Sequence, residues 1–203
     1  MFSVAATPPW SLWDGKDYKN MSDQDEAKFR MIEYHKWKFK AKIFSPLAPL
    51  TVKRTPVLMT RVEYGFLGSY NKYKKSPFET FYMGGDGMSG YSSTYATETI
   101  GLRGYENGSI AGNGGYNSYG YAYSRLSMEL RYPFLLEPSS TIYGLVFVEA
   151  GNAWRDLKDF NPFQLKRSAG VGVRIFLPMI GLMGIDWAYG FDRPDGYDQR
   201  GGS

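Results

Sequence analysis

Alternation of apolar and polar side chains is the feature of this sequence that most limits its fold. In RLSMELRYPF, residues 125–134, five apolar or aromatic side chains alternate with four polar or charged ones. Successive side chains of a β-strand point to opposite faces, so this stretch predicts a strand with one apolar and one charged face. The same pattern returns at 31–44, 57–66, 141–154, 165–177 and 183–192, with a partial strand at 2–7.

One of these stretches carries a row of lysines on a single face: Lys36, Lys38, Lys40 and Lys42. The opposite face carries Trp37, Phe39, Ala41 and Ile43. The predicted strands are roughly 11 to 17 residues long, whereas strands of globular proteins usually have about 5 or 6. This length suits a tilted strand that crosses a membrane, which needs about 9 to 11 residues in the hydrocarbon.

The connections between the predicted strands differ in length on the two sides of the sheet. LEPSS and PMIG are short and SPLAPLTVKRTP is intermediate, whereas 8–27, 68–117, 155–163 and the tail from 193 are long and polar. Short turns on one side and long loops on the other are typical of outer-membrane barrels. Aromatic residues near the strand ends could form the interfacial girdles of such a barrel: Trp10, Trp13, Tyr132, Phe134, Trp154, Phe176 and Trp187.

Composition excludes several other classes of protein. No apolar run reaches the length of about 18 residues that indicates a transmembrane helix. The chain has no cysteine, its +4 net charge is scattered, and its one histidine, His35, lies on an apolar strand face. We therefore predict no enzyme activity, no catalytic residue, no cofactor or metal, and no nucleic-acid partner. Residues 1–10 do not form a signal peptide, so export would require a longer protein.

A long loop at 68–117 contains the most informative motifs, FYMGGDGMSG and IGLRGYENGSI. They are followed in order by SMEL, FVEAGNAW and SAGVGVRIFLPMIGLMGIDWAYGFD. From about residue 27 to residue 192, this order resembles the C-terminal barrel of the BamA family of outer-membrane protein assembly factors. More broadly, it resembles the superfamily that includes TamA and the two-partner secretion transporters.

The resemblance implies a role for Arg103, Gly104 and Tyr105 in anchoring the loop inside the barrel. It also implies that Glu129 and Glu149 project inward and hold the arginine, and the alternation places both on the polar face of their strands. A guanidinium that leaves water is costly unless carboxylates pair with it. An ordinary surface arginine, or a pair of glycosidase carboxylates, are the alternative interpretations of these residues.

The fold class expected for residues 1–203 is all-β, an antiparallel transmembrane barrel to which the chain supplies about seven strands. The resemblance implies that the whole barrel has about 16 strands. We expect the early strands, the closing strand and the POTRA domains to lie outside it, and the isolated chain not to close. The resemblance implies a function in folding and inserting β-barrel proteins into the outer membrane of a Gram-negative bacterium. Expected partners are unfolded outer-membrane clients, the lipid bilayer, accessory assembly lipoproteins and the remainder of the same barrel. A polypeptide-secretion pore of the same superfamily and a soluble β-rich binding module are the alternatives.

Overall fold

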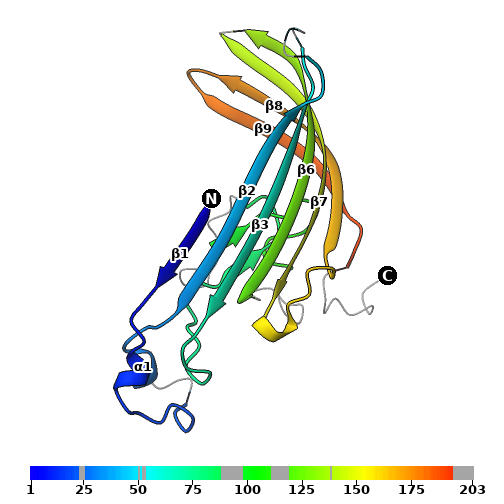
Figure 1. The fold of residues 1–203 in the computed structure, drawn as a ribbon. Helices are drawn as coiled ribbons and strands as arrows, with labels where there is room; N and C mark the ends of the chain where they lie inside the picture. Colours follow the sequence, from blue (N-terminus) through cyan, green and yellow to red (C-terminus); the bar gives the residue numbers. More distant parts are fainter. Residues whose placement is uncertain are drawn as a thin grey trace.

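A computed structural model describes residues 1–22, 26–49, 51, 54–87, 98–110, 119–137 and 139–193. Its main element is one curved antiparallel sheet of seven strands in the order β1-β2-β3-β6-β7-β8-β9 (Figure 1). The strands are β1 (Phe2–Ala6), β2 (His35–Pro46), β3 (Val57–Gly68), β6 (Ala122–Glu137), β7 (Ser140–Trp154), β8 (Lys166–Leu177) and β9 (Gly181–Gly190). The sheet confirms the predicted antiparallel all-β class, and β1 and β9 are its two unclosed edges.

The two faces of the sheet have the polarity that the alternation predicts. On β7, Val146 and Val148 are 55% and 52% exposed, whereas Glu149, which points to the opposite face of the same strand, is 3% exposed. The outer face of the sheet is therefore an exposed apolar surface. Leu145 and Phe147 depart from the pattern, because they are apolar and yet lie buried on the inner face.

Short turns gather at one end of the strands and long connections at the other (Figure 1). Glu137 of β6 pairs with Ser140 of β7 across a tight hairpin, and Gly181 begins β9 with a φ of 95°, which favours glycine. The β6–β7 register shifts between Pro133 and Leu135, where proline has no N–H to donate to its neighbour.

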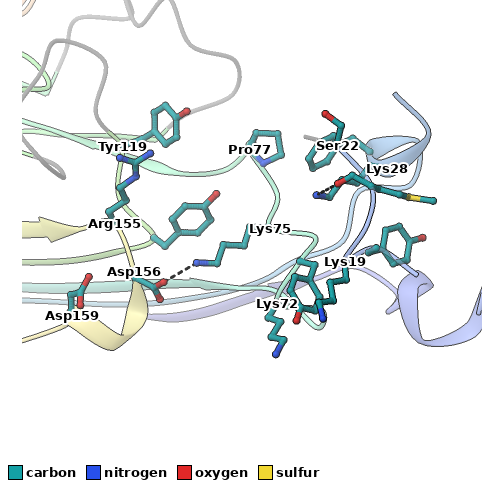
Figure 2. A pocket seen from close by; sticks show the side chains of 15 residues that line it. Lys19, Ser22, Lys28, Lys72, Lys75, Pro77, Tyr119, Arg155, Asp156 and Asp159 are labelled. Atoms are coloured by element: carbon teal, nitrogen blue, oxygen red, sulfur yellow. Dashed lines mark hydrogen bonds and ion pairs between the residues drawn. The ribbon is translucent and has the colours of Figure 1, made fainter. Parts of the chain in front are cut away.

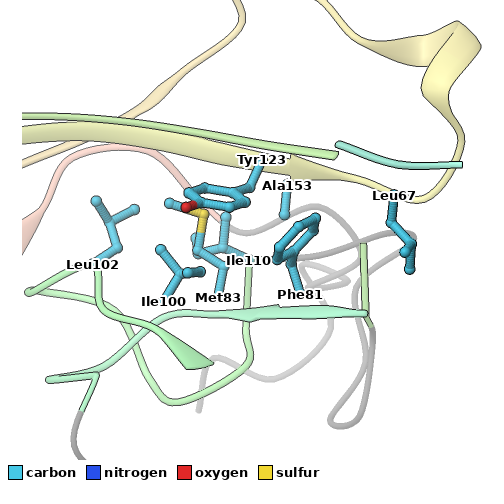
Figure 3. Packing of buried hydrophobic residues seen from close by; sticks show 8 residues of the cluster. All are labelled: Leu67, Phe81, Met83, Ile100, Leu102, Ile110, Tyr123 and Ala153. Carbon is cyan, nitrogen blue, oxygen red and sulfur yellow. The ribbon is translucent and has the colours of Figure 1, made fainter. Parts of the chain in front are cut away.

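The connection between β3 and β6 folds back over the inner face of the sheet (Figure 1). It contains a parallel pair of short strands, β4 (Phe81–Met83) and β5 (Glu98–Ile100). Figure 3 shows the hydrophobic core that forms between this loop and the sheet: Leu67, Phe81, Met83, Ile100, Leu102, Ile110, Tyr123 and Ala153. The core is therefore built from loop and sheet together. Residues 88–97 and 111–118 of the predicted 68–117 loop, and the tail from 194, lie outside the described residues.

The long connections also contain short helices that the alternation did not predict: α1 (Trp10–Trp13), α2 (Glu26–Phe29) and the 3-10 helix η1 (Leu157–Asp159). Two aromatic residues do not fit the predicted girdles. Trp154 is 6% exposed and packs edge-on against Phe160 at 4.7 Å, while Trp187 lies within β9 and not at its end. Within the described part of the chain, no helix is both long and apolar enough to cross a membrane.

Candidate functional site: an ion cluster beneath the loop

Arg103 leaves the loop after β5 and extends toward the inner face of the sheet. Its Nη2 donates to Oε1 of Glu129 at 2.6 Å and to Oε1 of Glu149 at 2.8 Å. Its Nη1 donates to Oδ2 of Asp186 at 3.3 Å, and its backbone N–H donates to Oε2 of Glu149 at 2.9 Å. Three strands, β6, β7 and β9, therefore hold one arginine of the loop.

The arginine is largely removed from solvent. Its side chain is 12% exposed, and the side chains of Glu129 and Glu149 are 7% and 0% exposed. The guanidinium carbon lies 3.6 Å from the ring centroid of Phe147, a distance at which a cation is attracted by the aromatic face. Burial alone would lower the pKa of Arg103, but the hydrogen bond and charge of Glu149, together with Glu129, raise it above its usual value. The cation is thus held permanently charged.

Each acid of the cluster is also paired with an arginine of the sheet. The pairs are Arg125 with Glu149 at 2.9 Å, Arg131 with Glu129 at 2.6 Å, and Arg174 with Asp186 at 2.6 Å. We call these six residues and Arg103 the ion cluster. Because the acids have partners of their own, the sheet stays neutralised at this point whether or not Arg103 is present. Every carboxylate of the cluster is paired with an arginine.

Gly104 and Tyr105 fix the loop beside the arginine. Gly104 has a φ of 91°, and a Cβ there would lie 2.9 Å from the backbone nitrogen of Gly190 on β9. The Tyr105 hydroxyl donates to the carbonyl of Arg167 at 2.7 Å and accepts from the N–H of Asp192 at 3.3 Å. Burial raises the pKa of Tyr105, so its hydroxyl remains a donor. The loop backbone therefore lies directly against β8 and β9.

The structure brings together all five residues that the resemblance pointed to, and it adds others. Sequence reasoning did not identify the sheet arginines, Asp186 or Phe147 as members of the cluster. The arginines and Asp186 all lie on the polar faces of their strands, so the alternation alone could have placed them on the inner face. Their proximity depends on the strand register, for example Ser127 opposite Glu149 and Glu129 opposite Phe147.

A separate cavity lies at the loop end of the sheet (Figure 2). Its volume is about 1070 Å³, and basic and tyrosine side chains line most of it. Figure 2 shows the ion pair of Lys75 with Asp156 at 2.9 Å on its wall, where both side chains are 41% exposed. Because such exposed pairs contribute little, we place the candidate site at the buried ion cluster. Among the described residues, no group of three or more histidine or acidic side chains could hold a metal ion.

Comparison with known proteins agrees with this architecture. The chain is similar to a solved structure of BamA from Haemophilus ducreyi that lacks POTRA domains 1–3, with a TM-score of 0.58 and 21% identity. The similarity covers 80% of this chain and 32% of that chain, so the protein spans about a third of the BamA structure. No curated protein matches the sequence. The sequence profile of the Omp85 superfamily domain matches residues 27–202, and the chain therefore belongs to the Omp85 superfamily.

Proposed function

We propose that this chain is part of an outer-membrane β-barrel that folds and inserts other β-barrel proteins. Membership of the Omp85 superfamily and the fold shared with BamA support an assembly or transport role in the outer membrane. The chemistry of the outer face supports the membrane location. Its exposed side chains are large and apolar on β2, β6, β7, β8 and β9, including Phe39, Leu130, Val148, Val173 and Trp187, while β3 between them carries half-buried ones. A contiguous surface of this kind fits lipid better than water.

The docked loop is the observation that favours assembly over secretion. Its hydrophobic core and the ion cluster hold it against the inner face of the sheet. A polypeptide that passed through the lumen would have to displace this loop, at the cost of breaking buried ion pairs. A client strand that adds to a sheet edge by β-augmentation would leave the loop in place. Arg103, Gly104 and Tyr105 are, in this proposal, the residues that anchor the loop, and Glu129 and Glu149 hold the arginine.

Reconstitution tests the function. The complete gene product is placed in liposomes, and a urea-unfolded small β-barrel client is added. We expect the client to fold several times faster than in empty liposomes, as measured by its heat-modifiable migration on a gel. An unchanged folding rate, with the client instead moved into the vesicle interior and protected from protease, would favour the secretion pore.

Single cysteines test the membrane-facing surface, since residues 1–203 contain no cysteine. A cysteine at Phe39 should be protected from a water-soluble thiol reagent, because this outer face contacts lipid. A cysteine at Lys38 should react, because the lysine faces the lumen at 28% exposure. Reaction at position 39 but not at position 38 would reverse the assignment of the two faces. Reaction at both would indicate a soluble sheet.

A further inference from the structure

The lysines of β2 lie on the inner face of the sheet and are not part of the ion cluster. We call Lys36, Lys38 and Lys40 the lysine row. All three contact one residue of the loop, Glu98 of β5, at 3.0, 3.0 and 3.5 Å respectively. Lys36 also pairs with Glu79 of the loop at 3.1 Å. Within the described ranges, every carboxylate at ion-pair distance from the row therefore belongs to the loop.

Lys36 is the most dependent of the three on the loop. Its side chain is 4% exposed, and its ammonium lies 4.8 Å from the ring centroid of Phe81 on β4. Glu79, Phe81 and Glu98 thus surround it, and each of them is a loop residue. A buried ammonium without a counter-ion is costly, and here the loop that covers Lys36 also supplies its counter-ions.

We propose that the lysine row is a second anchor for the loop and that Glu98 positions the loop on it. The loop contributes the anion at this anchor, whereas it contributes the cation at the ion cluster. The loop presents a cation, Arg103, to β6, β7 and β9, and it presents an anion, Glu98, to β2. Exchanging the two ends would place the cation Arg103 against the three lysines of the row. The two anchors therefore fix the direction in which the β4–β5 pair crosses the sheet, as well as its distance from the sheet.

The lysine row also borders solvent-accessible space. A cavity of about 560 Å³ lies beside it, lined by β1 residues, Lys36, Lys38, Glu79 and Glu98. Water and ions can therefore reach the pairs of the row, unlike Glu149 in the ion cluster, whose side chain is fully covered.

A thiol-labelling experiment on the complete protein tests this anchor. Ile100 of β5 is 4% exposed, so the variant Ile100→Cys should react slowly with a water-soluble maleimide while the loop is docked. In this background, Glu98→Lys places a fourth cation in the row. We expect the labelling rate to rise about tenfold, the factor that corresponds to about 1.4 kcal/mol. The matched control is Glu137→Lys, the same charge change on an exposed residue at the end of β6, which should leave the rate unchanged.

Charge exchange separates anchoring from general damage. Adding Lys38→Glu and Lys40→Glu to Glu98→Lys reverses Glu98 and two of its partners, leaves Lys36 with Glu79, and should return the rate to within about threefold of the parent. If Glu98→Lys prevents folding, as judged by heat-modifiability, Glu98→Gln takes its place and should raise the rate by a smaller factor. The proposal is overturned if Glu98→Lys labels like Glu137→Lys, or if the exchange fails to slow labelling in a folded barrel.

Discussion

The two anchors of the loop differ in where their counter-charges come from. At the ion cluster, the sheet supplies both acids and arginines, and Arg103 joins pairs that already exist. At the lysine row, the sheet contributes only the lysines of these ion pairs, and both carboxylates belong to the loop. The first site is preformed, whereas the second is completed by docking.

This difference predicts how each site responds when the loop leaves. The acids of the ion cluster would keep their own arginines, so that site would remain neutral and close to its present geometry. The lysine row would be left with three cations on alternate residues of one strand, which repel one another and attract water and anions. We therefore expect the ion cluster to contribute affinity for the loop, and the lysine row to make docking sensitive to salt and pH.

Removing an acid of the sheet should have the largest effect. Glu149 is fully covered and accepts from Arg103, Arg125 and Ser127. Glu149→Gln would remove the carboxylate that contacts both Arg103 and Arg125, leaving Arg125 only Glu63 at 3.8 Å, and the usual cost of breaking a buried pair is about 3–5 kcal/mol. Guanidinium unfolding of the detergent-solubilised protein should show this loss. Glu137→Gln at the exposed end of β6 should not change the midpoint. A loss for Glu149→Gln as small as that of this control would contradict the buried-pair account.

Removing the arginine of the loop should have a smaller and more local effect. Arg103→Ala removes the side-chain hydrogen bonds of the arginine, but the carboxylates that remain still pair with arginines of the sheet, so none is left buried without a partner. We expect the loop to become sensitive to protease while the sheet keeps its resistance to unfolding. Arg103→Lys should restore protection only in part, because an ammonium lacks the planar fork of a guanidinium. Equal losses in loop and sheet would show that the cluster is not preformed.

The sequence was sufficient to predict these strands because apolar and charged side chains alternate over long stretches. It was also sufficient to place Glu129, Glu149 and the lysines of β2 on the inner face. It failed at Phe147, because the inner face there is covered by Arg103 of the loop and not by water. It could not predict the contact of Glu98 with Lys38, which joins positions 60 residues apart and depends on how the loop folds. Local periodicity reports which face a side chain occupies, but not which neighbour covers it.

A methyl group at Gly104 tests how closely the ion cluster requires the loop to approach the sheet. The backbone φ of 91° is costly for any other residue, by roughly 1–2 kcal/mol. The new Cβ would also lie 2.9 Å from the backbone of β9, which is too close for ordinary contact. Gly104→Ala should therefore weaken docking without changing any charge, and the contacts of Arg103 should lengthen. Protease protection of the loop measures this effect. Protection equal to that of the unchanged protein would mean that the loop can move away from β9 without loss.

Acidification should distinguish the lysine row through the smallest effect. Burial alone would raise the pKa of Glu98, but hydrogen bonds from Lys36 and Lys38 outweigh burial and hold it below the ordinary value of 4.5. Lys40 and Glu79 also face this carboxylate, and Tyr123 lies close enough to feel its charge. Because the docked pKa is the lower one, Glu98 stabilises docking above the ordinary pKa and loses this effect as the pH falls through the docked value.

Hydrogen exchange of the Glu98 amide provides the measurement, since this N–H donates to the carbonyl of Thr80 at 2.9 Å only while β4 and β5 are paired. After correction for the intrinsic pH dependence of exchange, its protection should decrease as the pH falls below about 4.5, the ordinary glutamate range. In Glu98→Gln, which cannot titrate at this position, protection should be lower throughout and nearly independent of pH. Pairs in an accessible site are screened by salt, so about 1 M salt should mimic part of the acid effect in the unchanged protein but not in this variant. Parallel pH profiles of protection in the two proteins would show that a group other than Glu98 controls the loss of β4–β5 pairing. The lysine row would then contact the loop without making its docking sensitive to pH.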